Sequence, residues 1–386
     1  MDTRLAHQRP VPASVDFDRA PFLVIWETTQ ACDLACLHCR ASARPARDPL
    51  ELTTAEARAL VDAVRRLGRP LFVLTGGDPL KRPDTVSLVE YAASTGLRVA
   101  LTPSGTPLMT PRVLASLRDA GLARLAVSLD GATARGHDAF RGVAGSFDWT
   151  VGMLRAAREL GLSTQVNTTI TSLNVGDLES LITLVGELGI ALWSVFFVVP
   201  TGRARREQLP SADVVEGVLE RLAELAATAP FDIKTTAAPH YRRVLLQRRR
   251  EARRAGAVEA AGPGGVGAGM ISDGVGRARG VNDGNGFVFV SHRGEIFPSG
   301  FLPVSAGNVR THELGDVYRR HDTFRALRDA DRLKGKCGAC EYRWICGGSR
   351  ARAFAMTGDY LEADPLCAYV PTAWRREGRH DGGHQA

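Results

Sequence analysis

The chain has 386 residues, of which 44% are hydrophobic and 24% charged, with a formal net charge of +7 and seven cysteines. This length allows one large catalytic domain and a smaller one, and the hydrophobic content is high enough for a hydrophobic core. No stretch approaches the roughly 18 apolar residues of a membrane span, and the start, MDTRLAHQRP, lacks the apolar run of a signal peptide. We therefore expect a cytoplasmic protein without membrane contact, in which clustered cysteines bind metal rather than form disulfides.

The positive charge comes mostly from arginine. Basic residues are not interleaved with aromatic ones, so nucleic-acid binding is not the favoured interpretation. The densest basic run is YRRVLLQRRREARR, residues 241–254. It is interpreted either as a solvated basic helix or as a patch that holds an acidic substrate.

Strand and helix patterns alternate along the first half of the chain. Apolar runs typical of buried parallel strands occur at 21–27, 71–76, 97–102, 123–130, 163–170 and 191–199. Helical patterns lie between them at 53–68, 110–121, 148–160, 177–188 and 211–227. Six such units predict an α/β fold, a partial and open (β/α)6 TIM-like barrel with its active site at the carboxyl ends of the strands.

The later part of the chain breaks this pattern. Residues 262–286 are rich in glycine, and residues 287–301 read as a hairpin with a turn at 292–294. We therefore predict an N-terminal extension at 1–20, the barrel at 21–230, a basic helix and glycine-rich linker at 231–286, a small C-terminal domain with four cysteines at 287–372, and a disordered tail at 373–386.

Three cysteines, Cys32, Cys36 and Cys39, directly follow the first predicted strand. A cubane iron–sulfur cluster normally takes four thiolates, so three leave one iron open to a small molecule. The alternative is a structural zinc site with His38 as its fourth ligand. Zinc sites usually come as two separated pairs of ligands, which disfavours this alternative.

The CxxxCxxC spacing after a strand resembles the radical SAM superfamily. This resemblance implies a 4Fe–4S cluster on Cys32, Cys36 and Cys39, with S-adenosylmethionine (SAM) chelating the open iron. It also implies that one electron, supplied by a flavodoxin or ferredoxin, cleaves the sulfonium to methionine and a deoxyadenosyl radical. That radical would take a hydrogen atom from the substrate.

Motifs at the ends of later strands match the same superfamily. LTGGDPL (74–80) resembles its Gly-Gly-Glu-Pro stretch, LTPSG (101–105) its Ser-Thr-Asn-Gly, and SLDG (128–131) would supply ribose contacts. Taken alone, each could be ordinary turn chemistry. The SAM-contacting residues that the resemblance implies are Gly76, Gly77, Asp78, Pro79, Ser104, Ser128, Asp130, Asn167 and Pro200.

Four further cysteines lie near the C-terminus, at Cys337, Cys340, Cys346 and Cys367. They resemble the auxiliary-cluster domain (SPASM or twitch) of many radical SAM enzymes, although Ser299 stands where relatives often have a cysteine. We expect one fully ligated auxiliary 4Fe–4S cluster, with structural zinc as the alternative. The auxiliary cluster would either accept an electron from the substrate or only staple the small domain.

Two segments resemble particular branches. CGGSRARAFAMTGDYLEADPLC (346–367) resembles the haem-biosynthesis branch, and WETTQACDLACLHC (26–39) resembles mycofactocin-type peptide maturases. We predict an oxidoreductase that oxidatively modifies or decarboxylates a tetrapyrrole side chain, with carboxylates held by His240, Tyr241, Arg242 and Arg243. The alternatives are a ribosomal-peptide maturase, a sugar- or nucleoside-modifying enzyme of antibiotic biosynthesis, and an iron–sulfur or zinc protein that binds nucleic acid.

Overall fold

A computed structural model of the chain describes residues 16–255 and 280–376. Residues 1–15 of the predicted extension, 256–279 of the predicted linker and 377–386 of the predicted tail lie outside the described residues. The predicted tail begins with a short helix, α13 (Thr372–Arg376).

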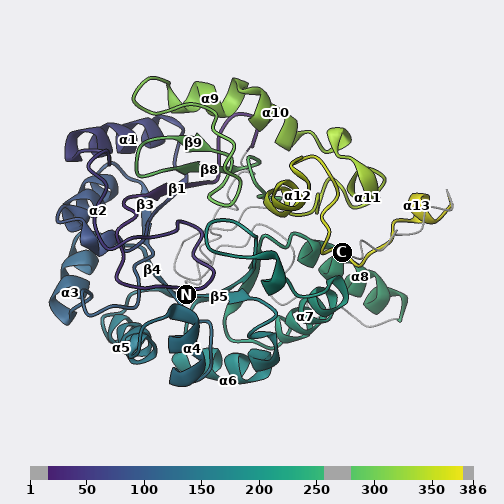
Figure 1. Cartoon of the computed structure of the whole chain (residues 1–386), viewed down its shortest axis with the longest axis horizontal. Coiled ribbons are helices and arrows are strands. Elements are labelled where there is room, and N and C mark those ends of the chain that lie inside the picture. The colour runs from purple at the N-terminus through teal and green to yellow at the C-terminus, as the bar shows by residue number, and fades with distance from the viewer. Residues whose placement is uncertain (1–15, 256–279, 377–386) are drawn as a thin grey trace, which may run out of the picture.

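The fold is built on one curled sheet with helices around its outside (Figure 1). Its spatial order is β7-β6-β5-β4-β3-β2-β1-β8-β9, with every neighbouring pair parallel except β8 and β9. Because β7 and β9 are edge strands, the barrel is open, as predicted. The strands are β1 (Leu23–Glu27), β2 (Leu71–Thr75), β3 (Arg98–Leu101), β4 (Arg124–Ser128), β5 (Thr164–Ile170), β6 (Leu192–Phe197), β7 (Asp232–Thr236), β8 (Phe287–Val290) and β9 (Ile296–Phe297).

The sheet is larger than the six predicted strands. The segment DIKTT forms β7 and pairs with β6, although its alternating polar residues gave it no strand signal. The first strand of the predicted hairpin, β8, pairs in parallel with β1, so Trp26 lies between Leu74 and Val290 in the register. Residues 287–297 therefore continue the barrel sheet.

Helices follow most strands and begin where capping chemistry favours them. In α1, the Thr53 side chain accepts from the Glu56 backbone N–H, while the Glu56 carboxylate accepts from the Thr53 N–H. The α-helices are α1 (Thr54–Arg66), α2 (Thr85–Ser94), α3 (Pro111–Asp119), α4 (Ala134–Arg141), α5 (Ser146–Glu159), α6 (Leu178–Leu188), α7 (Ala212–Leu225), α8 (His240–Arg254), α9 (Leu314–Arg320), α10 (Asp322–Arg328), α11 (Gly335–Gly338) and α12 (Arg350–Thr357). Short 3₁₀ turns lie at Pro79–Lys81, Val175–Asp177, Arg206–Gln208 and Ala330–Arg332.

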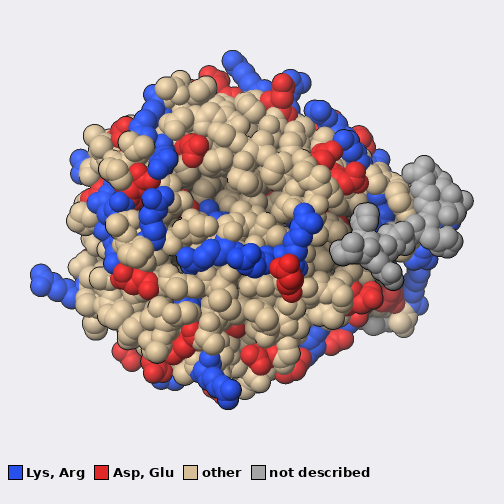
Figure 2. Space-filling view, in the orientation of Figure 1, with Lys and Arg blue, Asp and Glu red and all other residues tan. Residues whose placement is uncertain are grey.

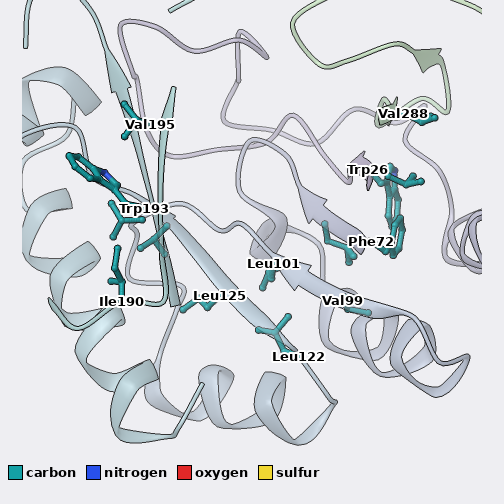
Figure 3. Packing of buried hydrophobic residues seen from close by; sticks show 14 of the residues in the cluster. Trp26, Phe72, Val99, Leu101, Leu122, Leu125, Ile190, Trp193, Val195 and Val288 are labelled. Carbon is teal, nitrogen blue, oxygen red and sulfur yellow. The ribbon is translucent and has the colours of Figure 1, made fainter. Parts of the chain in front are cut away.

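The main core lies between the sheet and the outer helices (Figure 3). Alternate residues of each strand face it: Val24 and Trp26 of β1 are fully buried, whereas Leu23 and Ile25 on the other face are only partly buried. The polar ends of the strands are thereby left at the inner face. Among the described residues, no helix is long and apolar enough to cross a membrane.

Candidate functional site

The three N-terminal cysteines lie on the loop that follows β1, and each sulfur accepts a hydrogen bond. Leu34 N donates to Cys32 Sγ (3.3 Å), and Ala43 N donates to Cys39 Sγ (3.4 Å). The third donor is a side chain, because Arg141 Nη1 lies 3.6 Å from Cys36 Sγ. Cys32 and Cys36 are buried, and all three pack with small apolar neighbours. Three converging thiols with polar donors and a dry surround fit a cluster with three protein ligands.

Arg141 is held in place by Asp130, the residue predicted to bind ribose. Asp130 is 1% exposed, forms an ion pair with Arg141 and accepts from Thr169 N (2.6 Å). Although burial raises the pKa of Asp130, the Arg141 charge more than offsets this and holds that pKa below its ordinary value. The carboxylate is therefore buried and positions the guanidinium at Cys36, and its contact with ribose stays a prediction.

The Gly-Gly-Asp-Pro stretch packs directly on the cysteine loop. Gly77 N donates to Thr29 O (2.7 Å), and Asp78 N donates to Ala31 O (2.6 Å). A Cβ at Gly77 would meet Ala31 O at 2.4 Å, and one at Gly76 would meet Thr29 O at 2.5 Å. Glycine is thus required at both positions by the contact between the two loops, apart from any ligand.

The Asp78 carboxylate is fully engaged inside the protein. It accepts from Leu80 N (3.1 Å), which caps the turn that Pro79 begins, and from Thr106 Oγ1 (2.8 Å). Burial raises the pKa of Asp78. The carboxylate therefore supports this loop, and its contact with SAM stays a prediction. Ser104 remains close to the sulfurs, because its Oγ donates to Gly77 O (2.8 Å) and lies 3.3 Å from Cys32 Sγ.

The remaining predicted SAM contacts lie on neighbouring strand ends. Ser128, the last residue of β4, is paired in register with Asn167 of β5 and is partly exposed. The Asn167 side chain accepts from Gln165 Nε2 (2.7 Å). Pro200 follows β6 and is also partly exposed.

The loop after β6 contributes a residue that the sequence did not single out. Arg203 Nε donates to Cys36 O (2.9 Å), its Nη1 donates to Ala43 O (3.1 Å), and its backbone N–H donates to Cys39 O (2.9 Å). Gly202, at φ +67°, allows this approach, since a Cβ there would meet Cys39 O at 2.4 Å. Arg203 therefore clamps the cysteine loop onto the barrel.

A buried carboxylate joins the cysteine loop to the C-terminal hairpin. Glu27 accepts from Arg40 Nη2 (2.6 Å), and its other oxygen lies 2.9 Å from His292 Nδ1. Burial raises the pKa of Glu27, but the Arg40 charge and the His292 hydrogen bond more than offset this and lower it below its ordinary value. Arg40 also lies over the Phe289 ring, at 4.6 Å from its centroid. The residue after Cys39 is thus anchored to β8.

The four C-terminal cysteines line one pocket. Backbone N–H groups of Tyr342 and Gly348 donate to the sulfurs of Cys340 (3.4 Å) and Cys346 (3.5 Å). Arg350 Nη2 donates to Cys337 Sγ at 3.5 Å. His240 and Arg243 complete the lining on the side of Cys367.

The residues that were predicted to bind substrate carboxylates lie in or next to this pocket. His240, Tyr241 and Arg243 are 1%, 5% and 3% exposed, and Arg243 pairs with Glu216. Arg242 donates to the carbonyls of Ile345 (3.1 Å) and Val281. Three of the four side chains are thus buried and Arg242 is partly buried, and the binding of substrate by these residues stays a prediction. The interpretation of 241–254 as a solvated helix is wrong for the first turn of α8, because Tyr241, Arg243 and Val244 are buried there.

The comparisons with known proteins agree with the first site. The model of the radical SAM superfamily matches residues 26–185. A protein named AdoMet-dependent heme synthase, from Methanosarcina barkeri, is 41% identical over 352 residues, which cover 91% of this chain and 97% of that one. The chain belongs to the radical SAM superfamily. It is an enzyme, which excludes the non-enzyme alternative, and the superfamily uses SAM with a 4Fe–4S cluster.

More distant radical SAM relatives carry other names. Mycofactocin maturase MftC of Mycobacterium tuberculosis is 31% identical over 93% of this chain and 86% of that one. Among solved structures, Streptococcus suis SuiB bound to S-adenosylmethionine matches with a TM-score of 0.67 at 16% identity, covering 91% of this chain and 78% of that one. At this identity the structural likeness establishes the fold only.

A single bound ion fits neither cysteine group of this radical SAM enzyme. Within residues 16–255 and 280–376, no three or more His, Cys, Asp or Glu side chains are gathered as ligands of one metal ion. His38, the alternative fourth zinc ligand, packs its ring on Phe140 at 4.5 Å, and burial lowers its pKa to about 4. The first cysteine group therefore fits the 4Fe–4S cluster of the superfamily better than zinc.

Proposed function

We propose that this radical SAM enzyme is a SAM-dependent haem synthase. It would take hydrogen from a tetrapyrrole side chain and bring about its oxidative modification or decarboxylation. The observation that carries this proposal is the 41% identity with the Methanosarcina barkeri heme synthase across 97% of that protein. The mycofactocin maturase shares only 31%. Modification of a peptide is therefore the alternative activity that the experiment must distinguish from modification of a tetrapyrrole.

In this proposal Cys32, Cys36 and Cys39 hold the SAM-binding cluster. When bound, that cluster supplies the electron that cleaves the sulfonium of SAM. The protein fixes the geometry: Arg141 and two backbone N–H groups orient the sulfurs, and Arg203 holds the loop. Hydrogen bonds of this kind position ligands and adjust the electronic properties of the metal site.

The proposed SAM contacts lie at or near the carboxyl ends of β2 to β6. They are Gly76, Gly77, Pro79, Ser104, Ser128, Asn167 and Pro200, of which Pro79 and Asn167 are buried. All but Asn167, which lies inside β5, follow or end a strand, at the edge of the sheet where barrels bind their ligands. Asp78 and Asp130 act behind this layer through the bonds described above.

The four C-terminal cysteines are proposed to hold one auxiliary 4Fe–4S cluster within residues 287–372. Support comes from their shared pocket and from the polar donors on Cys337, Cys340 and Cys346. Loss of carbon dioxide from a carboxylate-bearing radical releases one electron, so an internal acceptor suits the proposed reaction. A flavodoxin or ferredoxin is the proposed donor for SAM cleavage, which suits a reducing cytoplasm.

A tetrapyrrole with acidic side chains also suits the surface. Figure 2 shows Lys and Arg side chains in a band across the middle of one face, beside a shallow hollow. Such a band attracts carboxylates and speeds their encounter at low salt. Because His240, Tyr241 and Arg243 are buried and Arg242 is partly buried, this face is a better candidate for recognition than the first turn of α8.

The test is an anaerobic assay of the reconstituted full chain with SAM and dithionite. A propionate-bearing iron tetrapyrrole and a mycofactocin-type precursor peptide are compared as substrates. We expect deoxyadenosine, and loss of carbon dioxide with two hydrogen atoms from the tetrapyrrole, detected by mass spectrometry. Modification of the peptide alone would overturn the proposal. Changing Cys32, Cys36 and Cys39 to Ala should abolish deoxyadenosine and lower iron from about eight to about four per chain.

A further inference from the structure

The auxiliary pocket differs from the SAM-site loop in the charge of the groups that touch its sulfurs. At the SAM site the single charged donor, Arg141 on Cys36, is paired with Asp130. The charges of that pair cancel, and the other donors are neutral backbone N–H groups. Arg203, which has no ion-pair partner among the described residues, contacts this loop through the Cys36 carbonyl rather than through a sulfur.

At the auxiliary site the charged donor has no carboxylate partner. Arg350 is 2% exposed, and its guanidinium donates to Cys337 Sγ and to the carbonyls of Tyr360 (3.0 Å) and Glu362 (2.6 Å). The nearby Asp283 accepts from the backbone N–H of Ala351 instead. Among the described residues no acid forms an ion pair with Arg350. A full positive charge is thus buried against a ligand sulfur.

A histidine lies on the opposite side of the pocket. His240 Nε2 is 3.2 Å from Asp364 Oδ2, and Asp364 is also bound by Arg352 Nη1 at 3.0 Å. The charges of Arg352 and Asp364 cancel, and the His240 ring lies against Cys367 as well as Asp364. This side of the pocket therefore adds no unpaired cation.

Arg242 adds a second cation near Cys346. Its guanidinium donates only to carbonyl oxygens within the described chain, those of Ile345 and Val281. Positive charge and N–H donors at ligand sulfurs favour the more negative, reduced state of a cluster. The auxiliary site is therefore built to hold an added electron more firmly than the SAM site.

We propose that Arg350 and Arg242 raise the reduction potential of the cluster on Cys337, Cys340, Cys346 and Cys367, and so direct the substrate's electron to it. The inference rests on the proposed function. The balance is complete: the deoxyadenosyl radical takes one hydrogen atom, carbon dioxide leaves, and the one remaining electron reduces the oxidised auxiliary cluster. The two cations are positioning residues, since they act through the ligand sulfurs and the backbone beside them.

The experiment isolates the auxiliary site in the full chain with Cys32, Cys36 and Cys39 changed to Ala. This background is reconstituted anaerobically, and its remaining cluster is titrated by electron paramagnetic resonance against a potential series. We expect Arg350→Gln and Arg242→Gln each to lower the one-electron reduction constant about tenfold, a shift of about 59 mV to lower potential. Arg350→Lys, which keeps the charge, should restore most of the shift.

Arg343→Gln is the matched control. Arg343 lines the same pocket, but its guanidinium pairs with Asp331 at 2.9 Å near solvent. It should leave the potential unchanged. Unchanged potentials in Arg350→Gln and Arg242→Gln, with full iron content, would overturn the inference while leaving the auxiliary cluster itself in place. A background without iron would overturn the proposed cluster first. Should Arg350→Gln lose its iron, the potential of Arg242→Gln decides.

Discussion

Arg352 Nη1 donates to both carboxylate oxygens of Asp364, at 3.1 and 3.0 Å, and both side chains are fully buried. The same guanidinium donates to the carbonyls of Phe197 (3.3 Å) and Ala237 (2.7 Å). One ion pair therefore fastens α12, which follows the auxiliary cysteines Cys337 to Cys346, to the carboxyl ends of the barrel strands.

Arg352→Leu should destabilise the protein strongly. It leaves the Asp364 charge buried without its main partner, which typically costs about 3–5 kcal/mol. The free energy of unfolding, measured anaerobically in urea, tests this. Arg343→Gln breaks the exposed pair with Asp331 and should cost less than about 1 kcal/mol. Equal losses in the two variants would contradict the proposed role of burial.

Gly77→Ala should damage the cysteine loop without unfolding the barrel. The new methyl would meet Ala31 O at 2.4 Å, so the loop that holds Cys32 must shift. We expect SAM cleavage to fall about a hundredfold, the scale of a misplacement of about 1 Å. Gly186→Ala, in the exposed middle of α6 with nothing within 4 Å, is the control and should gain about 1 kcal/mol of stability. Normal deoxyadenosine formation by Gly77→Ala would refute the packing argument.

Substitutions at Asp130 and Arg141 should move the potential of the SAM-site cluster in opposite directions. Asp130→Asn leaves a bare cation beside Cys36 and should raise it, whereas Arg141→Gln leaves a bare anion and should lower it. Redox titration without SAM measures both. If Asp130 instead bound ribose, Asp130→Asn would weaken SAM binding and leave the potential unchanged.

Tyr318 should make stability fall at alkaline pH. Its buried hydroxyl donates to Phe17 O (2.6 Å) and accepts from Gly286 N (3.1 Å), and burial raises its pKa from 10 to about 12. The unfolded chain then loses this proton first, so the contribution is complete below about pH 10 and declines as pH rises to about 12. The expected loss is about 2–3 kcal/mol.

Urea unfolding of wild type and Tyr318→Phe from about pH 9 to about pH 11.5 provides the measurement. The difference between the two proteins should narrow as pH rises, because only wild type contains the titrating group. Tyr360→Phe, at a partly exposed position, controls for removal of a hydroxyl. A constant difference across this range would contradict the prediction.

Local patterns were sufficient to predict β1 to β6 and the helices α1, α3, α5, α6 and α7, whereas α2 and α4 were not predicted. The apolar residues of α1 recur with a helical period of 3.6 and form its buried face, which includes Ala57, Leu60, Val61 and Val64. The capping pair Thr53 and Glu56 marks where the helix begins. Strand β7 was not predicted, because Asp232 and Lys234 interrupt its apolar pattern. Pairing of β8 with β1 joins segments about 260 residues apart, and no local period reports such a contact.

The cysteine groups could be predicted because their spacing is local, but their supporting residues could not. Arg141 reaches Cys36 from α4, and Arg203 reaches it from the loop after β6. The sequence of residues 240–243 shows their charge but cannot show how deeply they are buried. Arg243, for example, forms an ion pair with Glu216 of α7, which is distant in the sequence. In the sequence, a run of basic residues looks the same whether it is exposed to solvent or packed beside cysteine thiols.

The position of β8 has a consequence for synthesis on the ribosome. Strand β1 emerges early, yet the neighbour on its second side is translated only at residues 287–290. Until then β1 is an unprotected edge, a template for pairing with other nascent chains. A chain that stops before Phe287 would keep that edge permanently, and we expect it to aggregate even though it contains the complete cysteine loop.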